Sequence, residues 1–145
     1  MKLFAKIAIA LASILLTSVS FAQVALYNSI PFYPGTIASA VAPATPAATP
    51  IKASAGYILS VVCGNILATP VYIKLFNTAS VTLGTTSATM NLLCPGNTAG
   101  AGFVYSLPWP ATFSTAIDYA VTGGISPTDN TAITASSVTV TFIYE

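Results

Sequence analysis

Apolar and polar residues alternate with a period of two along most of the chain after residue 50, which is the pattern of half-buried β-strands. In "VYIKLF" (71–76), Val71, Ile73 and Leu75 point one way, while Tyr72, Lys74 and Phe76 point the other way. "SVTVTFIYE" (137–145) alternates in the same manner. Further strands are expected at residues 57–63, 89–94, 102–107 and 117–122, with turns at "CGN", "PGNTAGAG" and "GGISPTDN" between them.

Short strands at this spacing are typical of antiparallel sandwiches. We therefore predict an all-β fold: a single antiparallel β-sandwich or jelly-roll-like domain over residues 51–145, with an extended N-terminal arm. A chain of this length can bury one such core.

The N-terminal segment has a different pattern, because Lys2 and Lys6 precede a mainly apolar run from Ile7 to about Val19, which is followed by small residues at Ser20 and Ala22. This pattern predicts a secretory signal peptide over residues 1–22. The apolar run is shorter than the roughly 20 residues that a spanning helix needs. We expect a secreted protein of the periplasm, cell surface or extracellular space, with no membrane span after cleavage.

Residues 23–50 are rich in alanine, proline and threonine, and "APATPAATP" (42–50) reads as an extended linker. We predict that residues 23–50 form an arm outside the domain. The free end of this arm carries an apolar cluster suited to lie on a neighbouring subunit: Val24, Leu26, Tyr27, Ile30, Phe32 and Tyr33.

Charge is scarce, and this excludes one class of partner. After removal of the signal peptide, Lys52 and Lys74 remain against Asp118, Asp129 and Glu145, a net charge of −1. Nucleic-acid binding needs several lysine or arginine contacts to phosphates, so we expect no nucleic acid as a partner.

The chain has two cysteines, Cys63 and Cys94, and no histidine. In an oxidising compartment a disulfide is the default for such a pair. Without histidine, a zinc site or a cysteine–histidine nucleophile lacks its usual partners, so we expect neither a metal nor a cofactor.

Candidate acid–base groups are few, and Asp118 and Asp129 lie far apart in the pattern. Asp129 with Asn130 could supply oxygen ligands to calcium, but a turn whose side chains bond their own backbone explains the pair better. Catalysis is not expected.

Trp109 lies between two prolines in "SLPWPATF" (106–113). Trp109 either fills one end of the sandwich core or, with Tyr105, forms a ligand platform. The second alternative is considered because exposed aromatic side chains often bind sugars or partner proteins.

Three stretches carry a resemblance: "IKASAGYILSVVCGN", "VYIKLFNTASVTLGTTSATMNLLCPGN" and the segment from Phe113 to the end. Residues 51–145 resemble small all-β structural proteins of tailed phages and prophages. The landmarks are Lys52, Ala53, Gly56, Asn65, the "VTLGTT" turn and Tyr144. The resemblance implies a virion-type β module, of a decoration or fibre-associated kind, without catalysis.

Strands that present threonine and serine with almost no charge lack the usual protection against edge-to-edge pairing. The leading hypothesis is an exported, non-enzymatic structural subunit that assembles with itself or with another surface protein. The alternatives are a secreted module that binds glycan or a host surface, and a virion-associated decoration protein.

Overall fold

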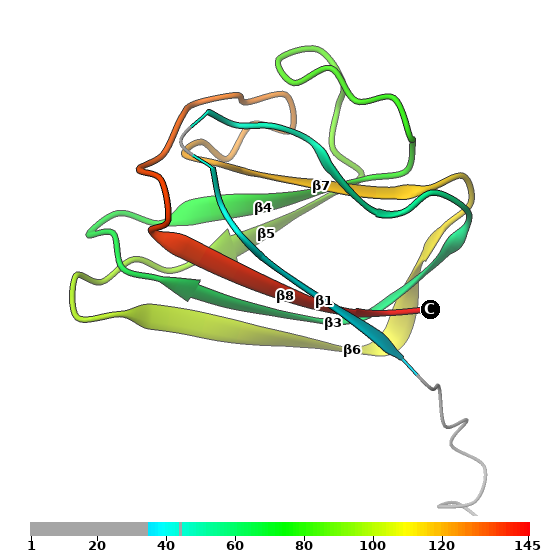
Figure 1. Cartoon of the computed structure of the whole chain (residues 1–145), viewed down its shortest axis with the longest axis horizontal. Coiled ribbons are helices and arrows are strands. Elements are labelled where there is room, and N and C mark those ends of the chain that lie inside the picture. Colours follow the sequence, from blue (N-terminus) through cyan, green and yellow to red (C-terminus); the bar gives the residue numbers. More distant parts are fainter. Residues whose placement is uncertain (1–34, 44) are drawn as a thin grey trace, which may run out of the picture. The chain divides into compact units, whose positions relative to one another are not determined.

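The computed structural model describes residues 35–43 and 45–145, apart from the side chains of Pro108 and Trp109, and Pro34–Glu145 forms one compact unit. This part of the chain contains strands and no helix (Figure 1). The strands are β1 (Thr36–Val41), β2 (Thr49–Lys52), β3 (Gly56–Asn65), β4 (Val71–Phe76), β5 (Met90–Cys94), β6 (Ala101–Phe113), β7 (Ile117–Thr122) and β8 (Val138–Tyr144).

The strands form two four-stranded antiparallel sheets. The first sheet has the order β1-β8-β3-β6, and the second sheet has the order β2-β7-β4-β5. Consecutive strands alternate between the two sheets, except for β4 and β5, which are neighbours in the second sheet. An eight-stranded double sheet with these connections is a jelly roll, so the predicted fold class is confirmed.

The core lies between the two sheets and is built from the inward positions of the period-two pattern. Val61 and Val140 of the first sheet and Ile73 of the second are almost completely buried. The rings of Tyr119 on β7 and Phe142 on β8 pack across the gap, with their centroids 4.8 Å apart. Apolar burial on both inner faces therefore holds the sandwich together.

The structure contradicts the expected linker, because two segments of its described part belong to the sheets. Residues 36–41 form β1, which pairs with β8 from Thr36↔Tyr144 to Val41↔Thr139. Residues 49–52 form β2, which pairs with β7. The alanine- and proline-rich composition suggested an extended chain, and the extended segments gain ladder hydrogen bonds from distant strands. A chain that begins at Pro50 would therefore lose β1, an edge strand of the fold.

The two sheets differ in what covers their outer faces. All six residues of β7 are buried, and Lys74 and Phe76 on β4 are buried although they point away from the core. The β4–β5 loop (77–89) and the β7–β8 loop (123–137) cover them (Figure 1), and the two loops are joined by a hydrogen bond from Ala88 N to Pro127 O of 3.1 Å. The half-buried character expected for β4 is therefore wrong, whereas β8 alternates as predicted.

Candidate functional site

The cysteine pair joins the two sheets. Cys63 on β3 and Cys94 at the end of β5 form a disulfide, with their Cα atoms 6.1 Å apart, and both residues are buried. The predicted disulfide is confirmed. It consumes both cysteines of the chain and therefore leaves no thiol for catalysis.

Lys74 is a fully buried lysine on the outer face of the second sheet, with a relative exposure of 0%. Its Nζ donates to the carbonyl oxygens of Gly124 (3.3 Å) and Ser126, and contacts Asn91 Oδ1 at 3.5 Å. Burial lowers the pKa of the Lys74 ammonium, and the nearby Asp129 carboxylate partly offsets this effect. Because its partners are mainly backbone carbonyls, Lys74 fastens the β7–β8 loop to the sheet.

Asp129 organises the same loop from within. Its carboxylate accepts hydrogen bonds from Gly124 N (2.9 Å), Thr131 N (3.1 Å) and Thr131 Oγ1 (2.7 Å). Burial alone would raise the pKa of Asp129, but these hydrogen bonds outweigh it and the pKa lies below its usual range. A Cβ at Gly124 would collide with the carboxylate, so glycine is required there. The turn interpretation of Asp129 is confirmed.

Asp118 on β7 is buried, and its Oδ1 has no hydrogen-bond partner. Burial raises its pKa. Asp118 and Lys74 both lie under the loops that cover the second sheet. Within the described residues no cluster of histidine, cysteine or carboxylate side chains is suited to hold a metal ion.

Replacing Asp118 by asparagine should raise the free energy of unfolding by about 1 kcal/mol at pH 7, because an ionised oxygen without donors is costly to bury. Since folding raises the pKa of Asp118 above its usual value, the protonated form favours folding at low pH, and this advantage is lost as the pH rises through the folded pKa. The gain should therefore shrink between pH 7 and pH 4 in urea titrations. A variant less stable than the wild type at pH 7 would contradict this account.

Of the two aromatic candidates for a ligand platform, only Tyr105 has a described side chain. The Tyr105 hydroxyl donates to Leu93 O at 2.8 Å, and the Tyr105 ring centroid lies 4.6 Å from that of Phe103. Tyr105 therefore links β6 to β5 at the margin where the two sheets meet. The side chain of Trp109 lies outside the described residues, so a platform formed by the two stays a prediction.

The proposed arm residues also lie outside the described residues, and their role in assembly stays a prediction. They are Val24, Leu26, Tyr27, Ile30, Phe32 and Tyr33. No helix of the described part of the chain is long and apolar enough to cross a membrane.

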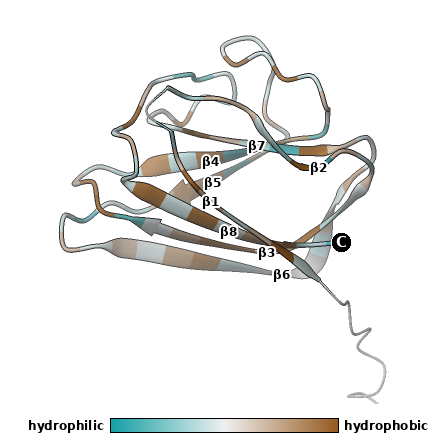
Figure 2. Cartoon of the chain, viewed as in Figure 1, coloured by the Kyte–Doolittle hydropathy of each residue, from teal (hydrophilic) through white to brown (hydrophobic). Residues whose placement is uncertain are grey.

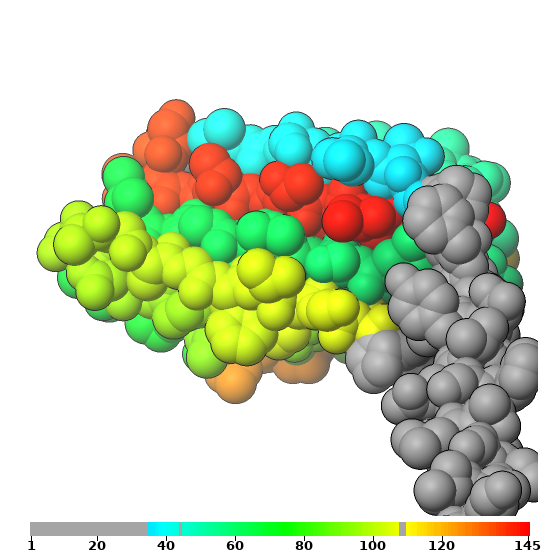
Figure 3. Space-filling model, turned by 90° about the horizontal axis from the view of Figure 1, so that it is seen from below, coloured from blue at the N-terminus to red at the C-terminus, as the bar shows by residue number. Residues whose placement is uncertain are grey.

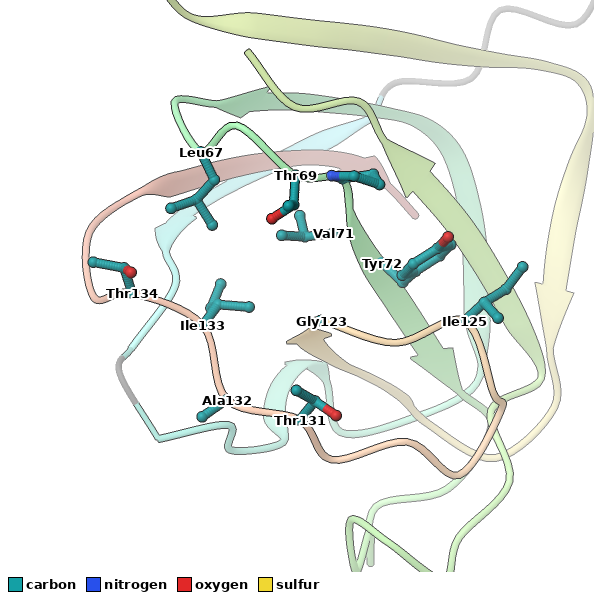
Figure 4. A pocket seen from close by; sticks show the side chains of 11 residues that line it. Leu67, Thr69, Val71, Tyr72, Gly123, Ile125, Thr131, Ala132, Ile133 and Thr134 are labelled. Carbon is teal, nitrogen blue, oxygen red and sulfur yellow. The ribbon is translucent and has the colours of Figure 1, made fainter. Parts of the chain in front are cut away.

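A pocket of about 630 Å³, which sequence reasoning did not anticipate, opens between the β3–β4 loop and the β7–β8 loop (Figure 4). Its walls combine apolar side chains with threonines and carry no charge: Leu67, Val71, Ile125 and Ile133, with Thr69 and Thr134. Figure 4 shows Leu67 and Ile133 on opposite loops. The lining also includes Tyr72 and Thr131, whose hydroxyl groups add to the polar part of the wall.

The exposed outer face of the first sheet is formed by strands without charged residues. β1, β3, β6 and β8 contain no lysine, arginine, aspartate or glutamate. Figure 3 shows the four strands side by side on this face, and Figure 2 colours β8 and β6 mostly pale to brown. Its exposed apolar members include Ile37 (67% exposed), Val41 (53%) and Val104 (57%).

Hydroxyl groups and glycines also lie on this face. Ser39 and Thr141 on neighbouring strands are hydrogen-bonded at 2.9 Å between their side-chain oxygens. Gly64 pairs with Gly102 across β3 and β6, and a Cβ at Gly102 would collide with the Cys63 carbonyl. The face is therefore low in relief as well as uncharged, a property suited to contact with another extended surface.

No protein-family model and no curated protein matches the sequence. Among solved structures, the chain is similar to the coat protein of tobacco streak virus at 10% identity, over 81% of this chain and 90% of that chain, with a TM-score of 0.38. The jelly-roll assignment of this chain rests on its own strand order.

Proposed function

We propose that this protein is an exported, non-enzymatic structural subunit that assembles with copies of itself through its first sheet. The observation that carries the proposal is the absence of charge from all four strands of that sheet, although its outer face is exposed. Soluble monomers normally place lysine, arginine, glutamate or aspartate at about a quarter to a third of surface positions.

The contrast with the second sheet supports this interpretation. That sheet contains Lys52, Lys74 and Asp118, and the chain covers most of its outer face with its own loops. The described residues provide no such cover for the first sheet. Contact with a second molecule would remove the exposed apolar groups of this face from water, which is favourable at roughly 25 cal/mol per Å².

The proposed export rests on the signal-peptide pattern of residues 1–22 and on the disulfide, which persists in oxidising compartments. Jelly rolls are common in viral capsids, so a virion-type subunit is a second candidate on the basis of the strand order. Glycan or host-surface binding through Tyr105 has less support, because the hydroxyl of Tyr105 is engaged by Leu93.

Size-exclusion chromatography with light scattering over a concentration series tests assembly. The wild type should be larger than a monomer, and Thr139→Lys should shift dissociation to a concentration about tenfold higher, because repeated positive charges would face one another across the contact. Thr139 is exposed on β8, in the middle of the first sheet.

Thr85→Lys is the matched control, since Thr85 is an exposed threonine on the β4–β5 loop, away from the first sheet. It should assemble like the wild type. Circular dichroism checks that both variants are folded. A wild-type protein that stays monomeric at every concentration would contradict the proposed function.

A further inference from the structure

β6 is one of the two outermost strands of the first sheet, and among the described residues it pairs only with β3. Along its other side, alternate backbone N–H and C=O groups have no neighbouring strand in the described part of the chain. Such an edge can pair with a strand from another molecule, and natural proteins usually prevent this with charge, proline or a bulge.

The segment Ala101–Leu107 of β6 has none of these protective features. It contains no charged residue and no proline, and its pairing with β3 is regular from Asn65↔Ala101 to Ser60↔Ser106. Protection begins immediately beyond it, where Pro108 and Pro110 follow and the register with β3 shifts. The open edge is therefore limited to 101–107.

The same segment exposes apolar side chains on both faces of the sheet. Phe103 is 51% exposed and its neighbour Val104 is 57% exposed, and adjacent strand residues point to opposite faces. A strand added along this edge would cover both side chains at once. Tyr105 is already fixed there by its bond to Leu93 O, so little side-chain freedom remains to be lost.

The other three edges differ. β2 carries Lys52, Pro50 and a register shift, and β5 is engaged at Leu93 O by the Tyr105 hydroxyl. β1 exposes Ile37 and Val41, which lie on one face of the sheet, whereas Ala40 packs against the core. A strand beside β1 would therefore cover these apolar side chains on one face of the sheet, whereas a strand beside 101–107 would cover apolar side chains on both faces.

We infer that the segment Ala101–Leu107 pairs antiparallel with the same segment of a second copy, and this rests on the proposed self-assembly. In a pairing centred on Val104, the two Val104 residues face each other, and Phe103 of each copy faces Tyr105 of the other. Aromatic cross-strand pairs of this kind are stabilising. The first sheets of the two copies become one continuous sheet, and their uncharged outer faces become one surface.

Cysteine cross-linking of the full chain tests this pairing. Directly opposed residues of antiparallel strands have Cα atoms about 4.5–5.5 Å apart, within the range of a disulfide. Under mild oxidation, Val104→Cys should form a covalent dimer on non-reducing gels. Ser106→Cys should give at least about tenfold less covalent dimer. Residue 106 opposes residue 102 of the other copy, so the two cysteines at position 106 are too far apart to form a disulfide.

Val104→Lys provides a second measurement, because it places two like charges directly opposite each other. Light scattering should show loss of the dimer, whereas Val104→Thr should keep it. Two results would overturn the edge pairing and leave the proposed function standing. The first is equal cross-linking of the two cysteine variants. The second is a Val104→Lys protein that still assembles like the wild type, together with a Val104→Cys protein that does not cross-link. A monomeric wild type overturns both.

Discussion

Replacing Lys74 by alanine should lower the free energy of unfolding by about 3–5 kcal/mol, the largest effect expected for a single substitution in this domain. The side chain is fully buried, so its removal leaves a cavity between β4 and the β7–β8 loop. The carbonyl oxygens of Gly124 and Ser126 also lose their donor. Urea denaturation measures the change.

Lys74→Met is the matched control, because it keeps most of the buried stem and removes only the ammonium. It should lie between the wild type and Lys74→Ala in stability. In Lys74→Ala, limited proteolysis should cut within residues 123–137 before the strands are attacked, because the loop has lost its attachment to the sheet. A Lys74→Met variant as stable as the wild type would show that packing of the stem, and not the hydrogen bonds, holds the loop.

Replacing Cys63 and Cys94 together by alanine should destabilise the domain by about 3.5 kcal/mol on the chain-entropy model of loop closure. The two cysteines are separated by 31 positions, and the bond joins β3 of the first sheet to β5 of the second. The loss corresponds to a fall in Tm of roughly 10–15 °C for a domain of this size. Differential scanning calorimetry measures it.

The double variant should keep its strand content by circular dichroism, because the core between the sheets remains. Reduction of the wild type with dithiothreitol should reproduce the fall in Tm, and reduction of the double variant should change nothing. If the reduced wild type keeps its Tm, the bond contributes little beyond the packing around it.

The strand pattern could be predicted from the sequence because period-two alternation is a local property. The bounds of β4 and β7 coincide with the predicted segments, and β8 lies within the predicted residues 137–145. The segment "VTLGTT" behaves differently, since Val81–Leu83 lie in a loop although their composition favours a strand. No neighbouring strand of the described residues supplies ladder hydrogen bonds to Val81–Leu83, and local composition cannot reveal this.

The cysteine pair was predictable for another reason: a chain with two cysteines allows one intramolecular disulfide. The candidate site as a whole was less predictable. Asp129 was recognised as a turn residue from its neighbours, whereas the burial of Lys74 was missed because alternation along β4 placed it on the solvent side.

The sequence by itself determined an all-β domain, a disulfide and the absence of charge from the four segments that form β1, β3, β6 and β8, although it did not predict β1 as a strand. Only the tertiary structure decided that these four strands share one sheet, and that loops cover the other sheet instead. The decisive contacts join distant parts of the chain: Lys74 reaches Ser126 across 52 positions, and β1 pairs with β8 at the opposite end of the domain. Alternation reports which residues share a face of a strand, but which face is covered depends on such long-range contacts, and these form only when the whole chain has folded.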